Sequence, residues 1–220
     1  MDAWAKIDLL YCERTDASFW AEPLNAVTNL AFLLAAALIV RRARSEHGAL
    51  PWDASVLAAL AALVGAGSFL FHTFATVWGR WLDLGFIAAF IYVLLARFLG
   101  RAAGLRWPGV LLGLVLYAAL ERGVLAAVPR GALGGSIVYL PALLTLGGCA
   151  AFAWKRGDRA ASRFGAALAV FAVALALRTI DGPVCEAWPV GTHFVWHLLV
   201  AWTLYLGATA VLTARRAAAS

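Results

Sequence analysis

Charged side chains are scarce in this sequence: Asp, Glu, Lys and Arg together make up 14% of its 220 residues, whereas 64% of the residues are hydrophobic. Soluble globular domains carry about 25% charged residues, so this composition excludes a soluble protein and predicts an integral membrane protein. Lysine is rarer still, because Lys6 and Lys155 are the only two. Neither lies in the last apolar run, which excludes a retinal-binding photoreceptor, since its chromophore is attached to a lysine of the last helix.

The sequence also lacks an apolar segment at its start. Its first residues are mixed in character and include the carboxylates of Asp2, Asp8, Glu13 and Asp16. A cleavable signal peptide has a basic start followed by a short apolar stretch, so we expect the N-terminal segment to remain on the mature protein. No polar linker, low-complexity segment or second domain follows. We therefore predict a single domain that spans residues 1–220.

Seven apolar runs are long enough to cross a bilayer, which takes roughly 17 to 25 helical residues. We predict an all-α integral membrane bundle of seven transmembrane helices. Twelve of the eighteen Lys and Arg residues fall in the loops and tail on the side of the C-terminus. By the positive-inside rule the C-terminus is cytoplasmic, and residues 1–23 form an extracytoplasmic segment. The runs lie near residues 24–42, 54–76, 81–99, 106–126, 133–154, 162–180 and 192–213.

The remaining composition indicates the kind of membrane. Ala and Leu are abundant and Arg greatly outnumbers Lys, which favours a bacterial inner membrane. The net charge of +6 reflects orientation across that membrane, so we predict no nucleic-acid partner. The sequence does not predict an oligomeric state.

Five polar side chains within the apolar runs fall in the outer half of the predicted bundle, towards the periplasm. Ser68 and His72 lie one turn apart on one helical face, and Asp83 opens the next helix after a short turn of Trp, Gly and Arg. His193 and His197 lie one turn apart on the last helix, a spacing that allows two imidazoles to bind one metal ion. Each histidine alone is equally well explained as a hydrogen-bonded contact between helices. Because three of the four histidines gather on this side, we predict that they form a metal site.

Three imidazoles with an open fourth position form the usual catalytic zinc site, in which bound water acquires a pKa of about 7. We therefore expect zinc at His72, His193 and His197. Asp83 would accept a proton from that water, and Ser68 would donate a hydrogen bond to the developing oxyanion, which suits hydrolysis of an acyl bond. Two other classes stay open. One is a ligand-sensing receptor with the same metal residues, and the other is a transporter with a His/Asp proton relay, which the clustering in one leaflet disfavours.

The S-x3-H pattern, the following aspartate and the H-x3-H pattern resemble the signature of the alkaline ceramidase family. That family belongs to a superfamily of seven-helix membrane hydrolases that also includes adiponectin/progestin-type receptors. The Cys12-Glu13 pair and the segment AEPLNAVTNLAF resemble the start of the family, so the resemblance covers nearly the whole chain. It implies that the three histidines hold zinc and that Ser68 and Asp83 act on the water and on the amide carbonyl. The implied substrate is ceramide or a similar N-acyl lipid, cleaved to a fatty acid and a sphingoid base or amine. Hydrolysis of another acyl lipid is the alternative.

The same resemblance bears on a second metal. The family has a calcium site near its N-terminus, and Glu13 and Glu22 match its ligands. Leu10 and Thr15, however, stand where an aspartate and an asparagine are expected. Because calcium prefers six to eight oxygen ligands, two carboxylates are a poor set and these departures argue against calcium.

A disulfide between Cys12 and Cys185 is expected from the topology together with the resemblance. Both cysteines fall on the extracytoplasmic side, where disulfides persist, whereas Cys149 lies within a helix. The family is similar in pairing its N-terminal cysteine with one before the last helix. Two reduced thiols that pack separately are the alternative.

Two charged pairs at the outer ends of helices have ordinary structural interpretations. We interpret Arg178 and Asp181 as an ion pair at a helix end, with a supporting role behind the metal ligands as the less favoured alternative. We interpret Glu121 and Arg122 as a pair at the membrane interface.

Overall fold

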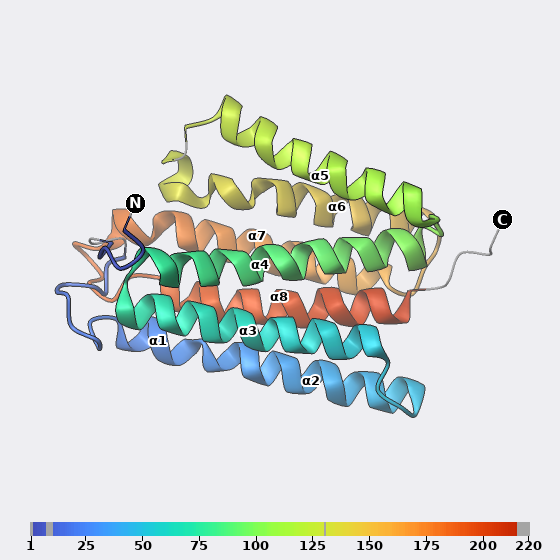
Figure 1. The fold of residues 1–220 in the computed structure, drawn as a ribbon, viewed down its shortest axis with the longest axis horizontal. Helices are drawn as coiled ribbons and strands as arrows, with labels where there is room; N and C mark the ends of the chain where they lie inside the picture. Colours follow the sequence, from blue (N-terminus) through green and yellow to red (C-terminus); the bar gives the residue numbers. More distant parts are fainter. Residues whose placement is uncertain (1, 8–10, 130, 215–220) are drawn as a thin grey trace.

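A computed structural model describes residues 2–7, 11–129 and 131–214 of the chain. The described residues form an all-helical bundle with seven spans long and apolar enough to cross a membrane, which confirms the predicted fold class. The spans run up and down along one long axis (Figure 1). In chain order the elements are α1 (Pro23–Thr28), α2 (Leu30–His47), α3 (Trp52–Phe74), α4 (Val77–Arg97), η1 (Phe98–Ala102), α5 (Trp107–Ala127), η2 (Ala132–Tyr139), α6 (Leu140–Lys155), α7 (Ala161–Val184) and α8 (His193–Thr213).

The seventh span, α8, lies at the centre of the bundle. About 72% of its most apolar stretch is buried, against 50% or less for every other span, and α8 contacts α2, α3, α4 and α7. Small side chains on α8, including Ala201, Gly207 and Ala208, are buried. Small residues allow close approach of helices inside a membrane, where packing contacts hold helices together. The core is therefore built around α8.

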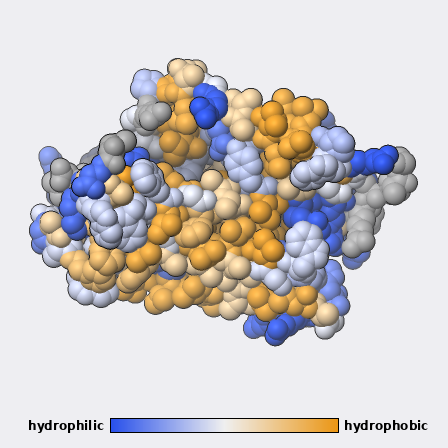
Figure 2. Space-filling view, in the orientation of Figure 1, coloured by the Kyte–Doolittle hydropathy of each residue, from blue (hydrophilic) through white to orange (hydrophobic). Residues whose placement is uncertain are grey.

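The surface of the bundle is apolar along its middle and polar towards its two ends (Figure 2). Leu34, Leu112 and Leu116 on the outer helices are each about 60% exposed. Such exposure suits contact with lipid tails, because each helix satisfies its own backbone hydrogen bonds and needs no water.

The turn between α3 and α4 differs from the prediction. We expected residues 78–80 to form the turn and Asp83 to open the following helix. Instead Ala75 adopts a left-handed conformation (φ 47°) directly after α3, and α4 begins two residues later. Thr76 caps α4, because its hydroxyl accepts a hydrogen bond from the Gly79 backbone N–H (3.4 Å). Asp83 consequently lies in the second turn of α4, where its helix faces α3.

The N-terminal segment is held against the end of the bundle that α3, α4 and α7 share. The Ile7 backbone N–H donates to the Ala75 carbonyl (2.7 Å), and the Val77 N–H donates to the carbonyl of residue 5 (3.1 Å). Farther along, a disulfide joins Cys12 to Cys185, with Cα atoms 5.2 Å apart. The expected cysteine pair is thus present in the structure, and it fixes this segment over the start of α8.

Candidate metal centre

Three histidines from two helices meet at the end of the bundle that the N-terminal segment covers. His72 lies in the last turn of α3, His193 is the first residue of α8, and His197 lies one turn farther along α8. One nitrogen of each lies within 4.8 Å of the others, and all three side chains are buried. Among the described residues they are the one group of three or more His, Cys, Asp or Glu side chains close enough to share a metal ion. His47, the last residue of α2, is exposed and is not part of this group.

A buried carboxylate orients the first of these histidines. The Nδ1 of His72 lies 2.5 Å from Glu22 Oε2, while Arg14 Nε donates to the other carboxylate oxygen of Glu22. Arg14 also donates to the backbone carbonyl of His72 (2.6 Å). Burial alone would raise the pKa of Glu22, but the hydrogen bonds and positive charge around it hold that pKa below its usual range. An ionised carboxylate only accepts, so Nδ1 of His72 carries a proton, and Nε2 is the nitrogen that could ligate a metal.

A hydroxyl group orients the imidazole of His197. Thr28 Oγ1 lies 3.0 Å from Nδ1 of His197 and also 2.6 Å from the Leu24 carbonyl. Because the single hydroxyl proton of Thr28 is donated to that carbonyl, the hydroxyl accepts from His197 Nδ1–H, and Nε2 of His197 is also free.

The third histidine has an unsatisfied nitrogen. Nδ1 of His193 is buried and has no hydrogen-bond partner among the described residues. The Tyr11 ring stacks on the His193 imidazole, with ring centroids 3.7 Å apart, which shields the cluster from the outside. Three buried imidazoles with free or unsatisfied nitrogens are suited to holding a metal ion, and two of them have the outer hydrogen-bond partners typical of metal ligands.

The predicted serine and aspartate lie beside this cluster. Ser68 and Asp83, together with His193 and His197, line a small enclosed space of about 10 Å³, which we call the site cavity. Ser68 and Asp83 face each other from α3 and α4. The backbones of these two helices approach closely, since a Cβ at Gly67 would lie 3.0 Å from the Leu82 carbonyl oxygen. The structure therefore brings all five predicted site residues together.

The sequence was then compared with known proteins. The family model described as Ceramidase matches residues 5–219, essentially the whole chain. The chain belongs to the ceramidase family. A comparison with curated proteins finds no match. Membership of this family makes the protein a membrane lipid amidase, a hydrolase that acts on the amide bond of ceramide. The resemblance noted in the sequence is thereby confirmed.

In this ceramidase Asp181 has a different partner from the one expected. It does not pair with Arg178 among the described residues. Its Oδ1 accepts from the backbone N–H groups of Thr192 (2.6 Å) and His193 (2.9 Å), and its Oδ2 accepts from the Cys12 N–H (3.2 Å). The Asp181 side chain thus caps α8, whose first residue is His193.

A glycine makes this capping arrangement possible. Gly191 has φ 63°, and a Cβ at this position would clash with Asp181 Oδ1 and lie 2.8 Å from the Cys12 Cβ. The start of α8 is therefore held by the carboxylate, the disulfide and a residue that must lack a side chain.

The two carboxylates matched to the family's calcium site have other partners in this structure. Glu13 accepts from the backbone N–H groups of Leu24 (2.6 Å) and Asn25 (2.8 Å), and so caps α1. Glu22 is engaged by Arg14 and His72, as described above. Leu10 lies outside the described residues. That this site does not hold calcium stays a prediction, and the Arg14 guanidinium beside Glu22 supports it.

Sequence reasoning missed Tyr11, Arg14 and Thr28, which surround the histidines. Arg14 carried a usable signal, because it is one of six basic residues on the side that the positive-inside rule depletes. Thr28 lies three residues after Asn25 on the polar face of the first span, where a histidine partner is a reasonable expectation. Tyr11 had no signal beyond its position next to Cys12.

Proposed function

We propose that this ceramidase is a zinc-dependent intramembrane amidase that hydrolyses ceramide or a similar N-acyl lipid to a free fatty acid and a sphingoid base or amine. The observation that carries the proposal is the cluster of three buried imidazoles beside Ser68 and Asp83. Three nitrogen ligands are a typical set for catalytic zinc. Zinc held by His72, His193 and His197 would supply a Lewis acid for the amide carbonyl and would lower the pKa of water to about 7.

The side chains around the cluster have separate tasks in this proposal. Asp83 accepts the proton of the attacking water and then delivers it to the nitrogen of the leaving amine. Ser68 donates a hydrogen bond to the carbonyl oxygen as that oxygen gains negative charge. Burial raises the pKa of the Tyr11 phenol, so Tyr11 keeps its proton and is a further donor at the edge of the site cavity.

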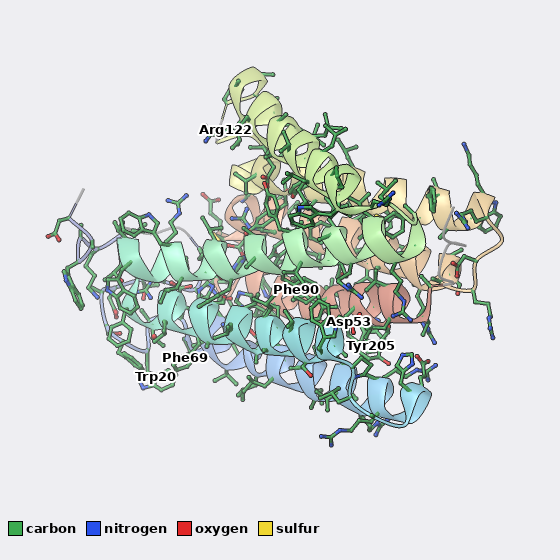
Figure 3. The ribbon with its side chains drawn as sticks, turned by 45° about the vertical axis from the view of Figure 1, so that its right-hand side comes forward. Trp20, Asp53, Phe69, Phe90, Arg122 and Tyr205 are labelled. Atoms are coloured by element: carbon green, nitrogen blue, oxygen red, sulfur yellow. A yellow bond between two sulfur atoms is a disulfide. The ribbon has the colours of Figure 1, made fainter. Side chains whose placement is uncertain are left out.

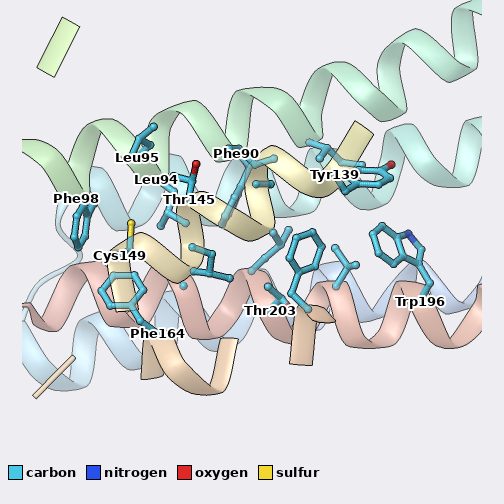
Figure 4. Close-up of a pocket in the computed structure, with 18 residues that line it drawn as sticks. Phe90, Leu94, Leu95, Phe98, Tyr139, Thr145, Cys149, Phe164, Trp196 and Thr203 are labelled. Atoms are coloured by element: carbon cyan, nitrogen blue, oxygen red, sulfur yellow. The ribbon is translucent and has the colours of Figure 1, made fainter. Parts of the chain in front are cut away.

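An apolar cavity next to the site cavity supports a lipid substrate. It has a volume of about 80 Å³, shares Trp196 and Val200 with the site cavity, and runs between α4, α6 and α8 to Phe98 and Phe164 (Figure 4). We call it the acyl cavity. None of its described lining residues carries a formal charge. It follows α8 from Trp196 to Gly207, a rise of eleven residue steps or roughly 16 Å at 1.5 Å per step. This length is about the thickness of hydrocarbon that one acyl chain crosses.

The same proposal includes an orientation. The excess of Lys and Arg at the other end of the bundle supports an outward-facing site, on the periplasmic side of a bacterial inner membrane. The Cys12–Cys185 disulfide at the site end agrees with this, because disulfides persist in the periplasm and are rare in the cytoplasm.

The experiment that tests the function combines metal analysis with product release. The purified protein in detergent should contain about one zinc ion per chain and release fatty acid from ceramide. His72→Ala, His193→Ala and His197→Ala should lose zinc and hydrolysis together, whereas the exposed His47→Ala should retain both. Full zinc content in the His193 and His197 variants would contradict the proposed ligand set. A protein that binds lipid but releases no fatty acid would instead support the receptor-like alternative.

A further inference from the structure

A larger cavity adjoins the site cavity on the side of α5. It has a volume of about 550 Å³, lies between α4, α5, η2 and the end of α7, and shares Tyr11 and Asp83 with the site cavity. It also shares Ile87 and Tyr139 with the acyl cavity. We call it the head cavity. A lipid whose amide lies at Asp83 and whose acyl chain fills the acyl cavity therefore has its amine side in the head cavity.

The head cavity carries more positive than negative groups. Arg80 of α4, Arg122 of α5 and Arg178 of α7 line it, together with the carboxylates of Asp83 and Glu121. Figure 3 shows Arg122 near the C-terminal end of α5, where this helix diverges from the rest of the bundle. Charged groups are costly near hydrocarbon, and a neutral lipid head gives no reason for three positively charged side chains in one cavity.

Two of these guanidinium groups have no partner in the part of the chain that the structure describes. Among the described residues, neither Arg80 nor Arg122 donates a side-chain hydrogen bond or forms an ion pair. Glu121 does not pair with Arg122 as we had interpreted it, because its carboxylate accepts a hydrogen bond from the Tyr92 hydroxyl (2.7 Å). The two arginines are therefore available to a bound molecule.

The third guanidinium is half-buried. Arg178 donates to Ser136 Oγ (2.9 Å) and the Gly134 carbonyl (3.3 Å), and it lies over the rings of Tyr139 (5.3 Å) and Trp196 (5.8 Å). Its Nε is buried without a hydrogen-bond partner, and no carboxylate of a described residue lies within 4.0 Å of it. The Tyr11 hydroxyl and the Asp83 carboxylate are the nearby groups that favour this positive charge, and an anion in the head cavity would be a closer partner for it.

We propose that the head cavity binds an anionic group, a carboxylate or a phosphate, on the amine side of the scissile amide. Guanidinium groups suit both anions, because they donate paired hydrogen bonds in a fixed geometry. The inference rests on the proposed function and names its substrate class: N-acyl lipids with an anionic head are cleaved in preference to neutral ones.

Two matched pairs of substrates test this. The first differs in charge with little change in the size of the head, and the second differs by a phosphate group on the head. N-palmitoylserine is compared with its uncharged carboxamide, and ceramide 1-phosphate is compared with ceramide, by fatty-acid release from the zinc-loaded protein in neutral detergent. The charged member of at least one pair should have a kcat/KM about tenfold or more higher, the scale of a charge-assisted hydrogen bond. The pair with the larger ratio identifies the anion.

Variants connect the preference to the cavity. Arg80→Gln and Arg122→Gln should each lower the charged-to-neutral ratio about tenfold, and Arg122→Lys should retain part of it. The matched control is Arg106→Gln, which removes an exposed arginine at the other end of α5 and should leave the ratio unchanged. Arg80 and Arg122 are both exposed, so their replacement should not unfold the protein, and Tm measurements verify this.

Three outcomes would overturn the inference. One is a ratio near one in both pairs, and another is a ratio that the Arg80 and Arg122 variants leave unchanged. The third is a ratio that disappears in 1 M salt, because it would show long-range steering by surface charge, which salt screens within about 3 Å. In each case both members of a pair are still cleaved and the proposed function stands. Cleavage of none of the four lipids would instead refute the proposed function, and this inference with it.

Discussion

Replacing Glu22 by Gln should weaken metal binding although Glu22 is not one of the proposed ligands. The carboxylate lies 2.5 Å from Nδ1 of His72, and the substitution keeps its size while removing its charge. Loss of a carboxylate behind a histidine ligand typically costs 10- to 100-fold in metal affinity, or about 1.4 to 2.8 kcal/mol. We expect zinc affinity to fall within that range.

The same substitution should also lower the stability of the fold, for a different reason. Glu22 is the carboxylate partner of Arg14, and both side chains are about 4% exposed. Removing one partner of a buried ion pair costs about 3 kcal/mol or more, because the other charge stays buried and unpaired. The double variant Arg14→Gln with Glu22→Gln removes both charges, so it should recover much of the stability. It should not recover the zinc affinity, because the His72 Nδ1–H still faces a neutral group.

Two measurements separate these effects. Competition with a chelating dye gives the zinc affinity, and thermal unfolding of the metal-free protein gives the stability. The reasoning fails if Glu22→Gln binds zinc as tightly as the unmodified protein. It also fails if the double variant regains full zinc affinity, since Glu22 would then act only by neutralising Arg14.

Three further predictions concern the chemistry, the start of α8 and the disulfide. Asp83→Asn should keep its zinc but lower turnover by about 10² to 10⁴, the usual effect of a general acid/base, and a near-normal rate would leave Asp83 a structural role. Gly191→Ala should lower the unfolding free energy by about 1–3 kcal/mol and weaken zinc binding, because its methyl group clashes with Asp181. The control is Gly182→Ala, whose methyl group meets no atom within 4 Å. Thiol labelling of denatured, unreduced protein should modify Cys149 alone, and labelling of all three cysteines would disprove the disulfide.

The number and position of the spans could be predicted from sequence, because each apolar run is long and the loops between runs are short and charged. Boundaries were less accurate at α4. Gly79 and Arg80 indicate a turn, yet a left-handed Ala75 and the Thr76 cap end α3 earlier and bring both residues into α4. A backbone conformation that Ala rarely adopts leaves no mark on the sequence, so this error could not have been avoided.

The three histidines, the serine and the aspartate could also be predicted, since each is a costly residue in an apolar run and the helical spacing puts them on shared faces. Their partners could not. Arg178 and Asp181 are one turn apart and suggested a local ion pair, but Asp181 caps α8 and Arg178 faces the head cavity. Contacts between residues far apart in the chain, such as Glu22 with His72, depend on how the helices pack, which local spacing does not report.

The central position of α8 has a consequence for biosynthesis. During translation α8 follows the six other spans, four of which it contacts, and it brings His193 and His197 with it. Until it inserts, the spans that it contacts lack their shared neighbour, and His72 has no neighbouring histidine. Packing of the bundle and assembly of the metal cluster are therefore a single late event, and a nascent chain that stops before α8 presents loosely associated helices to the proteases of the membrane.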